Sequence, residues 1–206
     1  MIVAEPPVRI VKVGGSLLDW PLLKNRLQEW LAAQPAVGSV LIAGGGDLTD
    51  SIRRAQAIHP FDDEAAHWMC VQALSVTARL LATLLPDPRL TNSLAELSAS
   101  LRSGGSTVVF DPATFLQHDE PHEPGAVLPH DWTATTDSIA ARLAAVTKTS
   151  ELVLLKSADP PPAVSLAELA SAGYVDRHFP LAAAGLPRIC LVNLRGESYP
   201  EVTLAR

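Results

Sequence analysis

The chain of 206 residues contains little cysteine, and its overall charge is negative. Its two cysteines, Cys70 and Cys190, are too few for a disulfide framework at this length, which favours a reducing compartment. The formal net charge is −6, so the sequence supplies no basic surface for nucleic acid or an anionic membrane. These shortages exclude a small disulfide-stabilised protein and a nucleic-acid-binding protein.

Long hydrophobic runs are also missing. No uncharged apolar stretch is long enough to span a bilayer, and Glu5, Arg9 and Lys12 interrupt any apolar segment of a signal peptide. Hydrophobic residues nevertheless make up 48% of the chain, which is ample for a sizeable core. We therefore expect a soluble, cytoplasmic protein that forms one domain.

Lysine is scarce, and its placement is informative. The chain has only four lysines, which are Lys12, Lys24, Lys148 and Lys156. Lys12 and Lys156 each stand at the end of an apolar run, where a lysine that serves only solubility is seldom found. Both positions therefore become candidates for binding an anionic ligand.

The first of these apolar runs organises the chain. Residues 8–13 are rich in β-branched residues and predict a buried strand, and Gly14, Gly15 and Ser16 follow before a helical pattern begins. Free N–H groups at a helix start, glycines without a Cβ and the nearby Lys12 would together form a phosphate-binding turn. The order of residues matches neither the Walker loop nor the dinucleotide fingerprint. A tight turn with a surface lysine is the open alternative.

The same pattern occurs a second time. Residues 39–43 predict a strand, Gly44, Gly45 and Gly46 follow it, and residues 48–59 predict a helix. Alternating strands and helices indicate an α/β fold with a mainly parallel sheet, in which ligands bind at the carboxyl ends of the strands. If the two strands are neighbours, both glycine turns border one crevice. A flexible loop is the alternative for the second turn.

The rest of the chain continues the alternation. Asp19 is expected to cap the helix over 21–33, in which Pro21 holds the first position, and the residues 62–85 predict one buried helix. Residues 117–132 are irregular, which is typical of a lid, a binding loop or a mobile segment. Further helices are predicted over 93–102, from about Asp137 onward, over 165–172 and over 179–185, and strands over 89–92, 106–110, 151–155, 188–192 and 201–204.

Several histidines and a cysteine raise the question of metal binding. His67 and Cys70 lie one helical turn apart, but no second pair with matching spacing exists, so we predict no resident metal ion. The three histidines of residues 117–132 lack rigid spacing. His67 is either a ligand-binding residue near the second glycine turn or a core histidine with one hydrogen bond, and the sequence leaves both open.

Four segments in order resemble the amino acid kinase family, which includes acetylglutamate, aspartate, uridylate and isopentenyl-phosphate kinases. They are Lys12-Val13-Gly14-Gly15-Ser16, Ala43-Gly44-Gly45-Gly46-Asp47, Thr135-Thr136-Asp137-Ser138-Ile139-Ala140 and Leu154-Leu155-Lys156-Ser157-Ala158-Asp159. The helix that begins Asp62-Asp63-Glu64-Ala65-Ala66-His67-Trp68-Met69, together with the chain length, most resembles the small kinases of methanofuran biosynthesis. Those act on an aminomethyl-furan-methyl phosphate.

The resemblance implies a three-layer α/β/α sandwich around a mainly parallel sheet. It implies one domain over 1–206, with an acceptor half at about 1–130 and a reduced nucleotide half at about 131–206. ATP and Mg²⁺ would be the cofactors, the substrate would be a small molecule, and the chain would form a homo-oligomer.

The resemblance also assigns roles to residues. Lys12 would stabilise the transferring phosphoryl group and Asp137 would hold that lysine. The remaining assignments are phosphate binding by Gly14, Gly15 and Ser16, acceptor binding by Gly44, Gly45, Gly46 and His67, and nucleotide binding by Lys156, Ser157 and Asp159.

Two departures keep a second function open. Pro160, Pro161 and Pro162 stand where family members continue with an Asp-Gly-Val-Tyr-like segment, and no lysine follows Lys156. Lys156 or Arg177 would have to replace the second catalytic lysine. We expect an ATP-dependent phosphotransferase that acts on a small anionic metabolite, and the alternative is a non-catalytic member that binds a phosphorylated metabolite or serves as a partner subunit.

Overall fold

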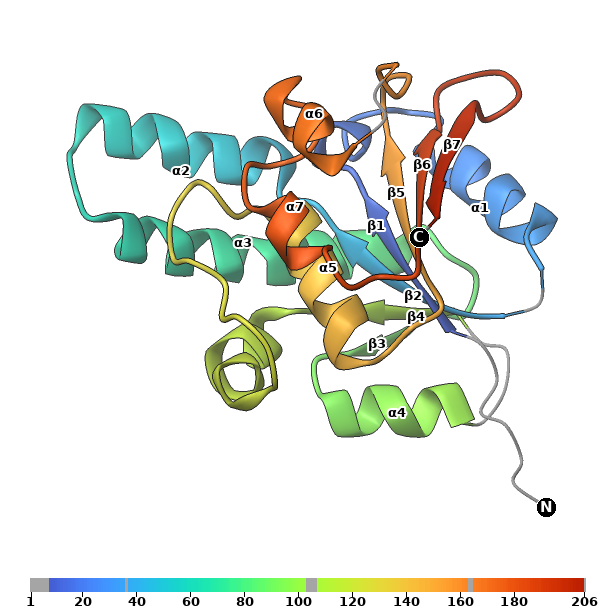
Figure 1. The fold of residues 1–206 in the computed structure, drawn as a ribbon, viewed down its shortest axis with the longest axis horizontal. Coiled ribbons are helices and arrows are strands. Elements are labelled where there is room, and N and C mark those ends of the chain that lie inside the picture. The colour runs from blue at the N-terminus through green and yellow to red at the C-terminus, as the bar shows by residue number, and fades with distance from the viewer. Residues whose placement is uncertain (1–7, 36, 103–106, 163–164, 206) are drawn as a thin grey trace.

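The computed structural model describes residues 8–35, 37–102, 107–162 and 165–205. In this part of the chain a seven-stranded sheet has the order β3-β4-β2-β1-β5-β6-β7, and every neighbouring pair is parallel except β6 with β7 (Figure 1). The strands are β1 (Val8–Val13), β2 (Gly38–Ala43), β3 (Arg89–Thr91), β4 (Thr107–Phe110), β5 (Glu151–Lys156), β6 (Arg188–Asn193) and β7 (Glu201–Ala205).

Helices cover both faces of the sheet and complete a three-layer α/β/α sandwich, as predicted. The helices are α1 (Leu23–Ala33), α2 (Gly46–Ile58), α3 (Asp63–Thr83), α4 (Leu94–Arg102), α5 (Thr136–Val146), α6 (Leu166–Ser171) and α7 (Phe179–Ala182). One core joins a face of the sheet to α4, α5, α6 and α7, and a second joins the opposite face to α1. Helix α3 contributes its N-terminal half to the first core and its C-terminal half to the second.

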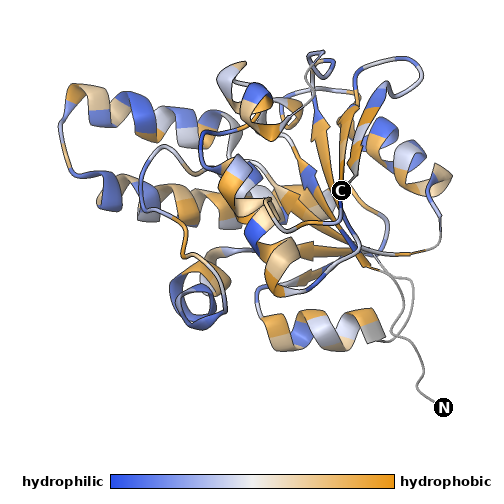
Figure 2. Cartoon of the chain, viewed as in Figure 1, coloured by the Kyte–Doolittle hydropathy of each residue, from blue (hydrophilic) through white to orange (hydrophobic). Residues whose placement is uncertain are grey.

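The central strands have the composition of a sheet that is buried on both faces. Every residue of β2 is buried, and β1 is buried from its second residue onward. Figure 2 shows these strands as largely hydrophobic, with hydrophilic residues gathered on the outer helix surfaces. Because both faces are covered, the carboxyl ends of β1, β2 and β5 are where polar side chains of the sheet can meet a ligand.

The helix predicted over 62–85 forms as α3, but it is not wholly buried. Asp62 caps it by accepting a hydrogen bond from the N–H of Ala65 at 2.6 Å. Met69, Val76 and Leu80 are 43%, 53% and 44% exposed, since only one side of this helix faces the sheet. The prediction of a fully buried helix was therefore wrong. Helix α2 beside it has no buried residue at all.

The start of α1 also differs from the prediction. The helix begins at Leu23 with Leu22 as its N-cap, because the short helix η1 (Gly15–Leu17) and a turn occupy the preceding residues. Pro21 consequently lies before the helix, and Asp19 does not cap it but approaches Arg195 at 3.9 Å. Ser106, the predicted first residue of β4, lies outside the described residues.

The segment 117–132 is anchored rather than free. It contains two short helices, η2 (Phe115–Asp119) and η3 (Glu120–His122). The buried Arg142 of α5 donates to Glu120 Oε1 at 2.8 Å and to the backbone oxygens of Glu123 and Pro124. A buried ion pair with satisfied hydrogen bonds therefore fixes this segment against α5. Among the described residues, no helix has both the length and the apolar character needed to cross a bilayer.

Candidate functional site

The two glycine turns touch each other at the carboxyl ends of β1 and β2. The N–H of Gly44 donates to Val13 O at 2.8 Å, and the N–H of Gly14 donates to Leu155 O at 2.8 Å. A Cβ on Gly15 would lie 2.4 Å from the nitrogen of Gly46. The glycines are therefore required because two backbones touch here. The sequence analysis had explained them instead by the close approach of an anion. Each turn leads into a helix, η1 after the first and α2 after the second, so both helix N-termini lie where the turns meet.

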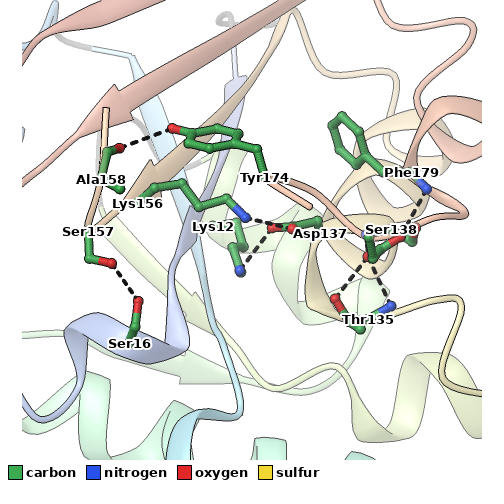
Figure 3. A network of polar contacts seen from close by, with 11 residues as sticks. Lys12, Ser16, Thr135, Asp137, Ser138, Lys156, Ser157, Ala158, Tyr174 and Phe179 are labelled. Carbon is green, nitrogen blue, oxygen red and sulfur yellow. Dashed lines mark hydrogen bonds and ion pairs between the residues drawn. The ribbon is translucent and has the colours of Figure 1, made fainter. Parts of the chain in front are cut away.

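Lys12, Asp137 and Lys156 form a buried cluster beside these turns. Lys12 Nζ lies 2.8 Å from Asp137 Oδ1, and Lys156 Nζ donates to Asp137 Oδ2 at 2.6 Å (Figure 3). The Lys12 contact is an ion pair without a well-directed hydrogen bond, so Oδ1 accepts none among the described residues. Lys12 and Lys156 come from the neighbouring strands β1 and β5, and Asp137 comes from the first turn of α5.

The cluster has an excess of positive charge. Burial by itself raises the pKa of Asp137, but Lys12 and Lys156 outweigh it and bring that pKa down to about 2. Burial and the nearby Lys12 lower the pKa of Lys156 to about 8, against the opposing effect of Asp137. At neutral pH the ionised Asp137 thus stands between Lys12 and a Lys156 that is mostly protonated. Two lysines on one carboxylate, close to the N-termini of η1 and α2, suit a phosphate chain.

The predicted nucleotide-binding residues lie at and after the end of β5 and make polar contacts there. The hydroxyls of Ser16 and Ser157 are 2.8 Å apart, which joins the first glycine turn to the end of β5. Asp159 Oδ1 accepts a hydrogen bond from Asn193 Nδ2 at 2.8 Å. Arg195 donates to Ser16 O at 2.8 Å. The sequence analysis did not single out Asn193 and Arg195, although Asn193 ends the buried strand β6 and Arg195 follows it, as the other candidates do at their strands.

His67 lies in a different hollow. It lines a largely apolar cavity of about 70 Å³ between α2, α3 and residues 131–139, and Arg53, Trp132 and Thr49 also line that cavity. Gly45 and Gly46 instead border a cavity of about 300 Å³ on the side of η1. The predicted acceptor residues are therefore not brought together in one cavity. Thr49 connects the two places, since it lines the cavity of His67 and its hydroxyl donates to Gly46 O at 3.0 Å.

Aromatic rings surround His67. Its ring stacks on that of His130 with centroids 4.6 Å apart, and Trp68 meets both rings edge-on. Burial, and secondarily His130, lower the pKa of His67 to about 4, so this imidazole is neutral at physiological pH. The Arg53 guanidinium lies 4.3 Å from the centroid of the Trp132 ring. In the described part of the chain, no three His, Cys, Asp or Glu side chains are grouped to hold a metal ion.

Three solved structures that share this fold are uridylate (UMP) kinases. The chain superposes on uridylate kinase from Archaeoglobus fulgidus with a TM-score of 0.61 and 20% identity, covering 90% of this chain and 89% of that one. UMP kinase from Bacillus anthracis superposes with a TM-score of 0.64 and 13% identity, covering 93% of this chain and 89% of that one. UMP kinase from Ureaplasma parvum superposes with a TM-score of 0.66 and 14% identity, covering 97% of this chain and 100% of that one.

These likenesses establish the fold and leave function to the site. No family model matches the sequence, and no curated protein matches it. The α/β/α sandwich is thus shared with the UMP kinases at low sequence identity, and the lysine cluster and the glycine turns must carry the functional argument.

Proposed function

We propose that this chain is an ATP-dependent phosphotransferase that acts on a small anionic metabolite. The observation that carries the proposal is the buried cluster of Lys12, Asp137 and Lys156 beside two touching glycine turns. Phosphoryl transfer needs positioning and neutralisation of charge more than covalent chemistry, and this cluster can supply both. The UMP kinases that share the fold support the proposal.

Each member of the cluster has a distinct part. Lys12, two residues before Gly14, would neutralise the phosphoryl group as it moves. Lys156 would neutralise the phosphates on the β5 side, and Asp137 would hold both ammonium groups in place. Mg²⁺ would arrive with the ATP phosphates and supply additional positive charge. The backbone N–H groups after Gly14 and Gly45 would orient the phosphate oxygens.

Because no lysine follows Lys156 in the chain, another residue must replace the second catalytic lysine of the family, and Lys156 is placed to do so. Its ammonium group shares Asp137 with Lys12, so the structure already holds two lysines on one carboxylate. We therefore assign to Lys156 the charge role that the sequence analysis left open between Lys156 and Arg177. Arg177 lies instead along a wide groove with Trp132 and Arg53.

The acceptor would enter from the side of Arg53 and Trp132. The cavity there is small and mainly apolar, and an arginine lies at its wall, which suits a compact ring that carries an anionic group. An aminomethyl-furan-methyl phosphate, the substrate of the methanofuran-type kinases that the sequence resembles, has that chemistry. We propose such an acceptor, in methanofuran-type cofactor biosynthesis and one-carbon metabolism in the cytoplasm, with uridylate as the competing candidate.

A non-catalytic role is the second candidate. The observations in its favour are the absence of any lysine after Lys156 and the run Pro160, Pro161 and Pro162 shortly after the end of β5. A chain of this kind would bind a phosphorylated metabolite through the same lysines without transferring a phosphoryl group.

Calorimetry and a turnover assay separate the two candidates. The purified protein is titrated with a non-hydrolysable ATP analogue and Mg²⁺, and then incubated with ATP and either aminomethyl-furan-methyl phosphate or UMP. We expect binding of the analogue and formation of ADP with the furan phosphate. Binding of the acceptor without nucleotide binding would support the non-catalytic role. Turnover with UMP but not with the furan phosphate would show that UMP is the acceptor.

A further inference from the structure

The first turn of α5, which carries Asp137, is held by a carboxylate from far along the chain. We propose that Asp176 is a positioning residue: its carboxylate fixes the backbone on both sides of Asp137, the residue that Lys12 and Lys156 share. The consequences for turnover rest on the proposed phosphotransferase function, whereas the protonation of Lys156 can be measured without it.

Asp176 uses both carboxylate oxygens on α5 and its own turn. Oδ2 accepts hydrogen bonds from Thr135 N and Oγ1, each at 2.9 Å, and from Ser138 N at 3.0 Å. Oδ1 accepts from Ser138 Oγ and from Phe179 N, the latter at 2.9 Å. Figure 3 labels the donor residues Thr135, Ser138 and Phe179, which lie beside the lysine cluster. Five donors on one carboxylate leave it little freedom to move.

This arrangement replaces an ordinary helix cap. Thr135 is the N-cap residue of α5, but its side chain makes no capping bond and donates to Asp176 instead. A carboxylate 38 residues further along the chain therefore satisfies the first-turn N–H of Ser138 and complements the helix dipole. Asp137 lies between Thr135 and Ser138 in the chain. Because Asp176 accepts hydrogen bonds from both of these neighbours, it sets the direction in which the Asp137 side chain points.

The charge of Asp176 adds a second effect. The charged groups that act on Lys156 are Lys12 from β1, Asp137 from α5 and Asp176 from the turn before α7, and the ring of Tyr174 lies 5.4 Å from Lys156 Nζ. Burial and Lys12 lower the pKa of Lys156, whereas Asp137 and then Asp176 raise it. Asp137 is shared by two lysines, so the additional negative charge of Asp176 helps to keep Lys156 protonated near neutral pH.

Nuclear magnetic resonance can test the charge effect in the free protein. The chain has only four lysines, so the ¹³Cε resonance of each can be followed against pH after labelling with ¹³C-lysine. In Asp176→Asn we expect Lys156 to lose its proton at a lower pH than in the wild type. Asp111→Asn is the matched control, since Asp111 is a buried carboxylate that accepts from Ser75 Oγ and Ala113 N at the end of β4. Unchanged titration of Lys156 in folded Asp176→Asn would overturn this part of the proposal.

Kinetics can test the positioning effect with variants that keep the charge. Ser138→Ala and Thr135→Val each remove donors to Asp176 without removing its carboxylate. We expect each to lower kcat about tenfold, with KM for ATP nearly unchanged and Lys156 titrating as in the wild type. Wild-type kcat in both variants would overturn the positioning role, and this arm stands even if Asp176→Asn does not fold. A wild-type protein without turnover would contradict the proposed function, while the titration would still decide the effect of Asp176 on Lys156.

Discussion

At the scale of single residues, the account depends on one carboxylate shared by two lysines. Burial and the nearby Lys12 lower the pKa of Lys156 to about 8, so the protonation of Lys156 changes close to physiological pH. We expect kcat to fall as the pH rises through about 8, since Lys156 then loses the charge that faces the phosphates. In Lys156→Arg any remaining activity should lack this decline, because arginine stays protonated. The kcat–pH profiles of both proteins check this, and the same decline in Lys156→Arg would contradict the role of Lys156.

Asp137 is expected to serve stability as well as turnover. Asp137→Asn would leave two ammonium groups around a neutral amide in a buried site. Removing one partner from a buried charge cluster costs about 3–5 kcal/mol, and misplaced lysines should lower kcat about 100-fold or more. Chemical denaturation and turnover measured on the same preparation check both effects. Loss of stability with normal turnover would reduce Asp137 to a residue that only supports the helix.

The low pKa of Asp137 also gives its stability contribution a direction with pH. The folded-state value, about 2, lies below the ordinary value of 3.8. The stabilisation is therefore fully present above about pH 4 and is lost as the pH falls toward 2.

At the scale of elements, contact between the glycine turns aligns β1 and β2 with α2. In Gly15→Ala the new Cβ would lie 2.4 Å from the backbone nitrogen of Gly46, so the turns must separate. We expect a loss of about 1–3 kcal/mol in the free energy of unfolding, together with reduced turnover. Thermal unfolding checks the first effect. Gly185→Ala is the control, because a Cβ at the exposed Gly185 meets nothing within 4 Å. Equal stability of both variants would show that the turns tolerate separation.

Most elements could be predicted from the sequence, because their signals are local. The β-branched runs before Gly14 and Gly44 correctly predicted β1 and β2, and α6 forms within the predicted 165–172, opened by a capping box of Ser165 and Glu168. At the start of α4, Ser93 Oγ accepts the N–H of Glu96 at 3.5 Å, whereas the Glu96 carboxylate accepts from Thr91.

The candidate site was less predictable, because its contacts join distant residues. The pairing of Lys12 with Asp137 was expected from the family resemblance, and the structure shows it. Nothing local indicates that Lys156 shares Asp137, since that contact requires β1 and β5 to be neighbours and α5 to lie over them. Asp176 likewise reaches α5 only through the fold. The exposed side of α3 escaped prediction because its pattern is apolar all round.

At the scale of the whole molecule, the exposed apolar stripe on α3 requires an explanation. Met69, Val76 and Leu80 lie on one side of that helix at spacings of seven and four residues. We propose that the chain forms a homo-oligomer through this stripe. Light scattering after size-exclusion chromatography should give at least twice the chain mass of 21.9 kDa for the wild type, and a monomer for Val76→Glu. Ile58→Glu, at the end of α2, should remain oligomeric. A monomeric wild type, or an oligomeric Val76→Glu, would contradict the proposal.

The central claim is that Lys12 stands where a phosphoryl group is transferred. The most direct test is the rate of ADP formation from ATP and Mg²⁺, with the acceptor that gives turnover, in the wild type, Lys12→Ala and Lys24→Ala. Lys24 is an exposed lysine of α1 and serves as the control. The account predicts a loss of about 100-fold or more in Lys12→Ala, with an unchanged circular dichroism spectrum, and no loss in Lys24→Ala. A folded Lys12→Ala that forms ADP at the wild-type rate would contradict it.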